Sequence, residues 1–120
     1  MTGTEPITTS IARSGGVVVL AVGGEIDLMT GAALEAAIDD ALGGPVTALI
    51  VDLSTVEFLG SVGLRILAAT HEQLSNSAQF AVVADGPATT RPIRLTKLDE
   101  VFAMYPMVED AMEALRAPAD

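Results

Sequence analysis

The stretch TALIVDL at residues 47–53 decides the fold class, because it is rich in β-forming residues and apolar at nearly every position. A strand that is apolar on both faces lies inside a sheet that helices cover on both sides. An amphipathic helix is predicted soon after it, at residues 62–74, where Leu64, Leu67 and Leu74 form one apolar stripe. A buried strand followed by such a helix predicts an α/β domain.

The segments on both sides of this strand and helix continue the alternation. On the N-terminal side, strands at residues 7–13 and 17–22 are joined by a tight turn, and an amphipathic helix follows at residues 29–42. We expect the first strand at the sheet edge and the second inside the sheet. On the C-terminal side, the sequence predicts a strand at residues 79–84, a helix at 90–97, a short strand at 101–105 and a helix at 109–116. This order predicts a small mixed β-sheet of four to five strands packed against about four helices.

The length of 120 residues fits a single domain, with a core at about residues 8–116 and short flexible termini. The longest apolar runs, at residues 17–22 and 48–51, are far shorter than the ~20 residues of a membrane span. Residues 1–6 lack the basic and apolar regions of a secretory signal. We therefore expect a cytoplasmic protein with no membrane segment.

Composition excludes several classes of function. The sequence has no cysteine and one histidine, His71, so it predicts no disulfide, no thiolate nucleophile and no metal site. Neither glycine-rich phosphate-binding motif is present, and no cofactor is predicted. Six basic against sixteen acidic residues give a net charge of −10, which repels nucleic-acid backbones. A partner protein should instead offer a basic or apolar face.

One enzymatic alternative is a serine hydrolase. LGSVG at residues 59–63 resembles the G-x-S-x-G elbow of that class, but Leu59 stands where the motif has its first glycine. His71 would lie about 15 Å along the same predicted helix from Ser61 and could not reach its hydroxyl. Hydrolysis of an activated ester would be needed to revive this alternative.

A second enzymatic alternative is a receiver domain. Asp52 follows a buried strand, where receivers carry their phosphoacceptor aspartate. Receivers also need an acidic pair after the first strand and a lysine on a later strand. Residues 22–25 supply one carboxylate, and the single lysine, Lys97, falls in a predicted helix. The sequence therefore predicts no enzyme of either kind.

Ser61 stands at the predicted junction between a strand and a helix, with Gly60 before it and Gly63 after it. Its hydroxyl is expected to cap the helix. A phosphate added there would meet the free N–H groups of the helix start, so the fold should tolerate it. About two added negative charges would instead act on whatever docks at that end.

Three segments in order resemble the STAS domains of bacterial anti-sigma factor antagonists: VGGEID at residues 22–27, LIVDLS at 49–54 and VEFLGSVGL at 56–64. The resemblance runs from about residue 8 to 116 and is nearest to the free-standing actinobacterial antagonists. It implies that Ser61 is phosphorylated by an anti-sigma factor that is a GHKL-type serine kinase, and that a PPM-type phosphatase reverses this. The unphosphorylated antagonist would bind the anti-sigma factor and release the sigma factor.

The same resemblance implies a partner-binding surface around Ser61. The family's aspartate after the second strand matches Asp27, which is also expected to cap the first helix. The usual D-S-[ST]-G-L pattern is altered, since Gly60 replaces its aspartate and Val62 its second hydroxyl. Glu57 adds to the acidic charge at this end. The predicted partner contacts are Glu25, Asp27, Thr30, Leu59, Gly60, Val62, Gly63 and Arg65.

One alternative function from another class stays open at this point. The helix start at Ser61 favours anions, so the domain could sense a nucleotide or another small anion there without any phosphorylation switch. Calorimetry with nucleotides discriminates between the two functions.

Overall fold

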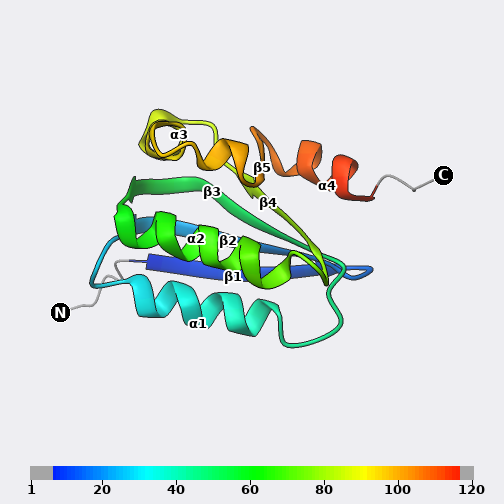
Figure 1. The fold of residues 1–120 in the computed structure, drawn as a ribbon. Helices are drawn as coiled ribbons and strands as arrows, with labels where there is room; N and C mark the ends of the chain where they lie inside the picture. The colour runs from blue at the N-terminus through cyan, green and yellow to red at the C-terminus, as the bar shows by residue number, and fades with distance from the viewer. Residues whose placement is uncertain (1–6, 117–120) are drawn as a thin grey trace.

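A computed structural model, which describes residues 7–116, shows five strands in one mixed sheet with the order β1-β2-β3-β4-β5 (Figure 1). Four helices and one short 3-10 helix connect and cover the strands. The predicted flexible termini lie outside the described residues. The elements are β1 (Ile7–Ser14), β2 (Val17–Ile26), α1 (Gly31–Ala41), β3 (Ala48–Leu59), α2 (Ser61–Leu74), β4 (Gln79–Val83), α3 (Pro87–Leu95), η1 (Leu98–Glu100), β5 (Ala103–Tyr105) and α4 (Val108–Arg116). The predicted α/β class and the count of strands and helices are confirmed.

The sheet is mixed because its first two strands form a hairpin. β1 runs antiparallel to β2, and the two-residue turn between them uses Gly15 and Gly16 at φ 58 and 90. Two successive residues with positive φ suit glycine and match the twist of the strands. All other neighbouring strands are parallel. As predicted, β1 lies at the edge and β2 inside the sheet.

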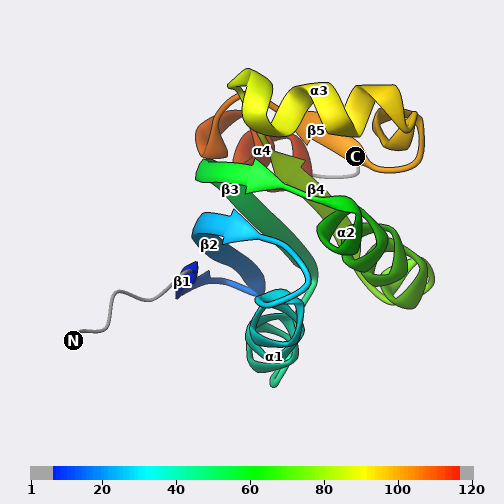
Figure 2. The same ribbon diagram turned by 90° about the vertical axis from the view of Figure 1, so that its left-hand side faces the viewer.

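Helices cover both faces of the sheet. α1 and α2 pack side by side on one face, over fully buried residues such as Leu20 and Val51 (Figures 1 and 2). α4 covers the other face, where Ala111 joins Ile50 and Val83 in a second apolar cluster. α3 lies beside the second half of β3, past the end of β4 (Figure 2). Among the described residues, no helix combines the length and apolar character that a bilayer crossing requires.

Both central strands are longer than predicted. β2 continues to Ile26 and β3 to Leu59, whereas the apolar runs end at residues 22 and 53. The two strands stay paired because the register shifts twice, and Gly24 takes a φ of 97 between the shifts. Such bulges let a strand continue where its apolar pattern stops. The extension brings the ends of β2 and β3 to the same edge of the molecule.

The third helix begins earlier than predicted, at Pro87 instead of residue 90. Proline fits the first helical position because its missing N–H has no partner there in any case. Gly86 precedes it, and its carbonyl accepts bonds from the backbone N–H groups of Thr89 and Thr90. The helix stops before Lys97, which has a φ of 62.

Candidate functional site

Ser61 is the first residue of α2 and is exposed to solvent. The prediction that its hydroxyl caps the helix is wrong, because Gly60 occupies the N-cap position and no side chain caps this end. The Gly60 N–H donates to the Ile26 carbonyl at 2.9 Å, and the Gly60 carbonyl accepts from Leu64 N at 3.1 Å. Backbone pairing with β2 therefore fixes the helix start and leaves the Ser61 hydroxyl at the surface.

Two glycines allow close packing beneath the site: Gly63 brings the start of α2 close to the ends of β2 and β3, and Gly31 brings the start of α1 close to α2. A Cβ on Gly63 would lie 2.6 Å from both Ile26 Cγ2 and Leu59 Cδ1. A Cβ on Gly31 would lie 2.7 Å from Val62 Cγ1. Because real Cβ atoms do not approach so closely, only glycine allows this packing. The position of Ser61 thus depends on contacts beneath it.

Replacing Gly63 with alanine is expected to lower the free energy of unfolding by about 1–3 kcal/mol. Alanine should gain up to about 1 kcal/mol in helix propensity, but the overlap with two buried side chains outweighs that gain. Urea denaturation measures the difference. The control is Gly44→Ala, since a Cβ there meets nothing within 4 Å. Equal stability of the two variants would contradict the tight packing.

A tight turn links β2 to α1. The Asp27 carboxylate accepts a bond from Met29 N at 2.9 Å, and the Asp27 carbonyl accepts from Thr30 N at 3.2 Å. The predicted helix-capping role of Asp27 is therefore wrong in its position: Thr30 is at the N-cap, and Asp27 caps the turn before the helix. Aspartate commonly stabilises such turns by bonding to backbone N–H groups two residues on.

The hydroxyl of Thr30 holds this turn from inside the protein. Thr30 is 2% exposed. Its Oγ1 donates to the Glu25 carbonyl at 2.8 Å and accepts from Asp27 N at 2.9 Å. It closes the turn on both sides and so fixes the loop that carries Leu28 and Met29.

We expect Thr30→Val to reduce the free energy of unfolding by about 1–3 kcal/mol, because the same-sized side chain leaves two partly buried backbone groups without their hydroxyl partner. Thr30→Ser keeps the hydroxyl and serves as the matched control. Thermal denaturation of both variants measures the effect. If valine and serine were equally tolerated, the hydroxyl would not hold the turn.

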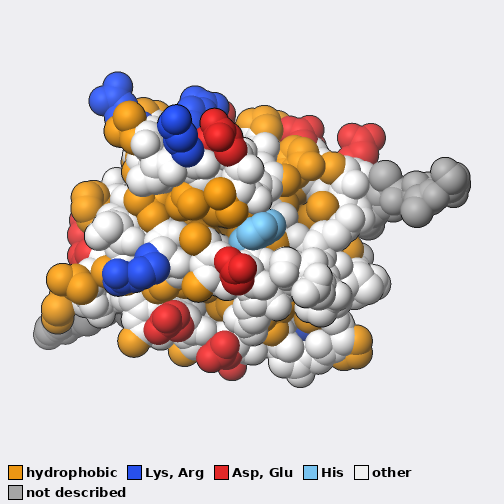
Figure 3. All heavy atoms as spheres, viewed as in Figure 1, with side chains coloured by type: hydrophobic (Ala, Val, Ile, Leu, Met, Phe, Trp, Pro, Cys, Tyr) orange, Lys and Arg blue, Asp and Glu red, His pale blue; other side chains and the backbone are white. Residues whose placement is uncertain are grey.

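Exposed apolar side chains surround Ser61. Leu28 is 83%, Met29 88% and Phe58 51% exposed. Together with Ser61, Val62, Gly60 and Asp27 they line an open hollow of about 330 Å³. Hydrophobic side chains are visible at this end of the molecule, on the left of Figure 3. We call Leu28, Met29, Phe58 and Val62 the apolar patch; adjacent exposed apolar residues on a small protein commonly mark an interaction surface.

The predicted site residues fall into three groups. Asp27, Gly60, Ser61 and Val62 line the hollow. The side chains of Glu25 and Arg65 are exposed but do not line it. The remaining three, Thr30, Leu59 and Gly63, are buried, so they shape the surface from below and do not present side chains to a partner.

Leu28, Met29 and Phe58 line the hollow but were not predicted as site residues from the sequence. A signal was present for the first two, because Leu28 precedes the helix predicted at residues 29–42 and Met29, at its start, falls outside the apolar stripe at Leu34 and Ile38. Large apolar residues that no predicted core can bury are candidates for a binding surface.

With this geometry in place, comparison with known proteins decides the family. The family model of the STAS domain matches residues 8–111. This chain belongs to the STAS domain family. It is 51% identical over 116 residues to the anti-sigma-F factor antagonist RsfB of Mycobacterium tuberculosis, covering 97% of this chain and 95% of that protein.

Solved STAS structures have the same fold. The crystal structure of an anti-sigma factor antagonist from Mycobacterium paratuberculosis superimposes with a TM-score of 0.89 at 52% identity, covering 97% of this chain and 99% of that one. The unphosphorylated form of the anti-sigma factor antagonist SpoIIAA matches with a TM-score of 0.76 at 18% identity, covering 94% and 100%. The SpoIIAA likeness shows the fold alone.

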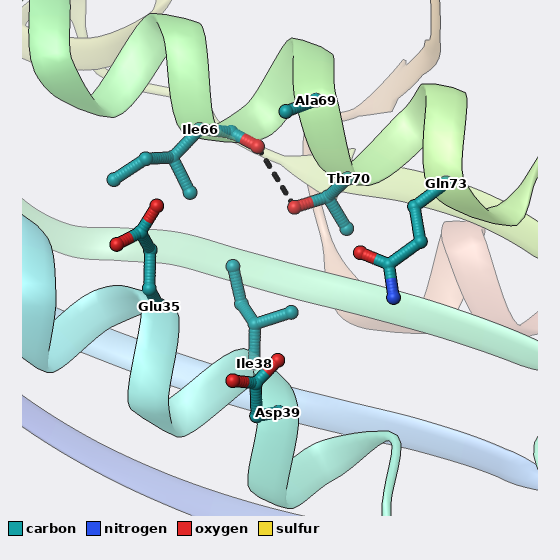
Figure 4. A pocket seen from close by; sticks show the side chains of 7 residues that line it. All are labelled: Glu35, Ile38, Asp39, Ile66, Ala69, Thr70 and Gln73. Atoms are coloured by element: carbon teal, nitrogen blue, oxygen red, sulfur yellow. Dashed lines mark hydrogen bonds between the residues drawn. The ribbon is translucent and has the colours of Figure 1, made fainter.

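This STAS domain has a second hollow, between α1 and α2 (Figure 4). Ile38 and Ile66 form its floor, and the exposed carboxylates of Glu35 and Asp39 stand on the α1 side. The Thr70 hydroxyl donates to the Ile66 carbonyl at 2.8 Å, which uses its hydrogen. The Thr70 hydroxyl therefore does not donate to the carboxylate of Glu35 or Asp39, which could otherwise act as a base.

The hydrolase alternative depended on His71 and the receiver alternative on Asp52, and both side chains contact other residues of the fold. His71 is half-buried, and its ring centroid lies 6.3 Å from Phe80 and 6.4 Å from Phe102. The Asp52 carboxylate accepts a bond from Ser54 N at 3.0 Å. Neither residue lines the hollow at Ser61.

Proposed function

We propose that this STAS domain is an anti-sigma factor antagonist that is switched by phosphorylation of Ser61. Two mycobacterial relatives are named as anti-sigma factor antagonists, at 51% and 52% identity over nearly the whole chain, and this supports the antagonist part of the proposal. The observation that carries the proposal is an exposed serine hydroxyl inside an exposed apolar patch. Binding of the partner and phosphorylation of Ser61 would then use the same surface.

The proposed phosphate donor is ATP bound to the anti-sigma factor, acting as a GHKL-type serine kinase. The Ser61 oxygen forms a bond to the γ-phosphorus, the bond from that phosphorus to the bridging β,γ oxygen breaks, and ADP leaves. The hydroxyl proton is released to solvent or to a base of the kinase. A PPM-type phosphatase would restore the hydroxyl by transferring the phosphoryl group to water.

Phosphorylation at this point would oppose docking directly. An apolar patch gains its binding free energy by losing contact with water. A phosphate adds about two negative charges and three strongly hydrated oxygens beside that patch. The partner would have to desolvate them or leave the patch uncovered. The domain itself needs no catalytic group for this role, and we assign it none.

Reconstitution with the cognate anti-sigma factor and its sigma factor tests the proposal. The unmodified domain is expected to displace the sigma factor from the complex as its concentration rises. Incubation with ATP should add one phosphate, seen as a mass increase, and displacement should then fail. A domain that never binds the anti-sigma factor would overturn the function, and a phosphate on another residue would overturn the site.

The small-anion alternative has less support. The Asp27 carboxylate lines the hollow at Ser61, and the exposed carboxylates of Glu25 and Glu57 belong to the strands that end beside it. Negative charges repel an anion at short range. We expect isothermal calorimetry with millimolar ATP or GTP to show no binding, and a clear heat of binding would restore the alternative.

A further inference from the structure

Arg65 differs from the other charged residues near Ser61 in carrying a positive charge. From residue 14 to residue 90 the sequence holds one lysine or arginine, and it is Arg65. The guanidinium of Arg13 is bonded to the Asp40 carbonyl at 3.0 Å, near the far end of α1. Two further arginines are on α3, which follows β4. Arg65 therefore supplies the positive charge on the two helices that begin at the site.

Helix geometry places Arg65 on the same face as Ser61. The two residues are four apart on α2, and both are exposed. Residues at this spacing are neighbours on a helix surface. Side chains on a helix lean toward its N-terminus, so the Arg65 side chain extends over the turn that begins at Ser61.

Among residues 7–116, the other charged groups near Ser61 are negative. Asp27 lines the same hollow, Glu25 and Glu57 are exposed on β2 and β3, and Glu35 is exposed on α1 facing the second hollow. Further along α2 come His71 and Glu72, more than two turns from Ser61. A phosphate on Ser61 would add to several carboxylates, and in the part of the chain that the structure describes Arg65 is the nearby cation that could offset them.

We propose that Arg65 pairs with the phosphate of phosphorylated Ser61 within the same chain. The inference rests on the proposed phosphorylation of Ser61 and goes beyond it. A guanidinium can donate two parallel hydrogen bonds to phosphate oxygens, which a lysine cannot. Phosphorylation would then change the docking surface in two ways: it would add negative charge, and it would make the Arg65 guanidinium unavailable to a partner.

Phosphorus NMR tests the pairing without any kinase. Phosphoserine is incorporated at position 61 during translation, and the phosphate resonance is followed from pH 4 to 8. A nearby cation favours the dianion and lowers the second pKa of the phosphate, so Arg65→Gln should raise that pKa by about 0.5 unit, a roughly threefold change in proton affinity. Arg65→Lys should restore part of the shift.

Arg94→Gln is the matched control, because it removes the same charge from an exposed position on α3. It should leave the phosphate pKa within about 0.1 unit of the unmutated phosphoprotein. An unchanged pKa in Arg65→Gln, or an equal shift in both variants, would overturn the pairing. Because the phosphate is built in, failure here leaves the phosphorylation proposal standing, and failure of the kinase assay leaves this result standing.

Discussion

Replacing Ser61 with glutamate is expected to weaken binding to the anti-sigma factor at least tenfold, a loss of about 1.4 kcal/mol or more. The carboxylate puts a permanent charge beside the apolar patch, where a docked partner would have to desolvate it. Ser61→Ala should bind within about threefold of the wild type and should take up no phosphate. Both variants should fold, because the side chain is exposed and makes no cap.

Titration calorimetry with the anti-sigma factor, and mass spectrometry after incubation with ATP, measure the two effects. Ser77→Glu is the matched control: it introduces the same charge at an exposed serine, just after the other end of α2. If this control weakened binding as much as Ser61→Glu, net charge would explain the loss instead of position. A phosphorylated Ser61→Ala variant would move the switch to another residue.

The order of strands and helices could be predicted because buried faces require apolar residues at regular spacings in the sequence. The run at residues 47–53 has to be covered on both faces, and β3 is indeed buried there between two apolar clusters. The stripe on α2 likewise fixes which side of the helix faces the sheet. Periodicity of this kind depends on side chains alone, and it is the strongest signal in a single sequence.

Features that depend on backbone hydrogen bonds were harder to predict. β2 and β3 continue past their apolar runs because bulges and a positive φ at Gly24 keep them paired. Both predicted caps were displaced: the Gly60 N–H bonds to the Ile26 carbonyl and sets the start of α2, and the turn that Asp27 and Thr30 close comes before the start of α1. A one-residue shift changes the role of Ser61 from a capping group to a free surface hydroxyl. Such shifts are within the usual uncertainty of helix ends.

The pattern left Leu28 and Met29 outside the apolar stripe, but it could not show that they are exposed, because their exposure depends on the turn that presents them. Thr30 anchors that turn from below, and its hydroxyl bonds involve two other backbone positions. The resemblance to the family located the site mainly through its polar and glycine residues, together with Leu59 and Val62. The side chains that offer the most apolar area to a partner lie between those motif residues.

The double variant Leu28→Ser, Met29→Ser is expected to weaken binding to the anti-sigma factor at least a hundredfold, about 2.8 kcal/mol. Covering a large apolar side chain contributes about 1.5–3 kcal/mol, and two neighbours in one patch should act together. Their exposure of 83% and 88% means that the fold loses almost nothing, so the free energy of unfolding should change by less than about 0.5 kcal/mol.

Leu95→Ser, Met107→Ser is the matched control, since these residues are 76% and 53% exposed and lie outside the apolar patch. Surface plasmon resonance against the immobilised anti-sigma factor should show wild-type affinity for this control and a faster dissociation rate for the patch variant. Equal losses would mean that general hydrophobicity, and not this surface, drives association. A patch variant that no longer binds the anti-sigma factor but is still phosphorylated would separate kinase recognition from docking, and the shared surface would no longer explain the switch.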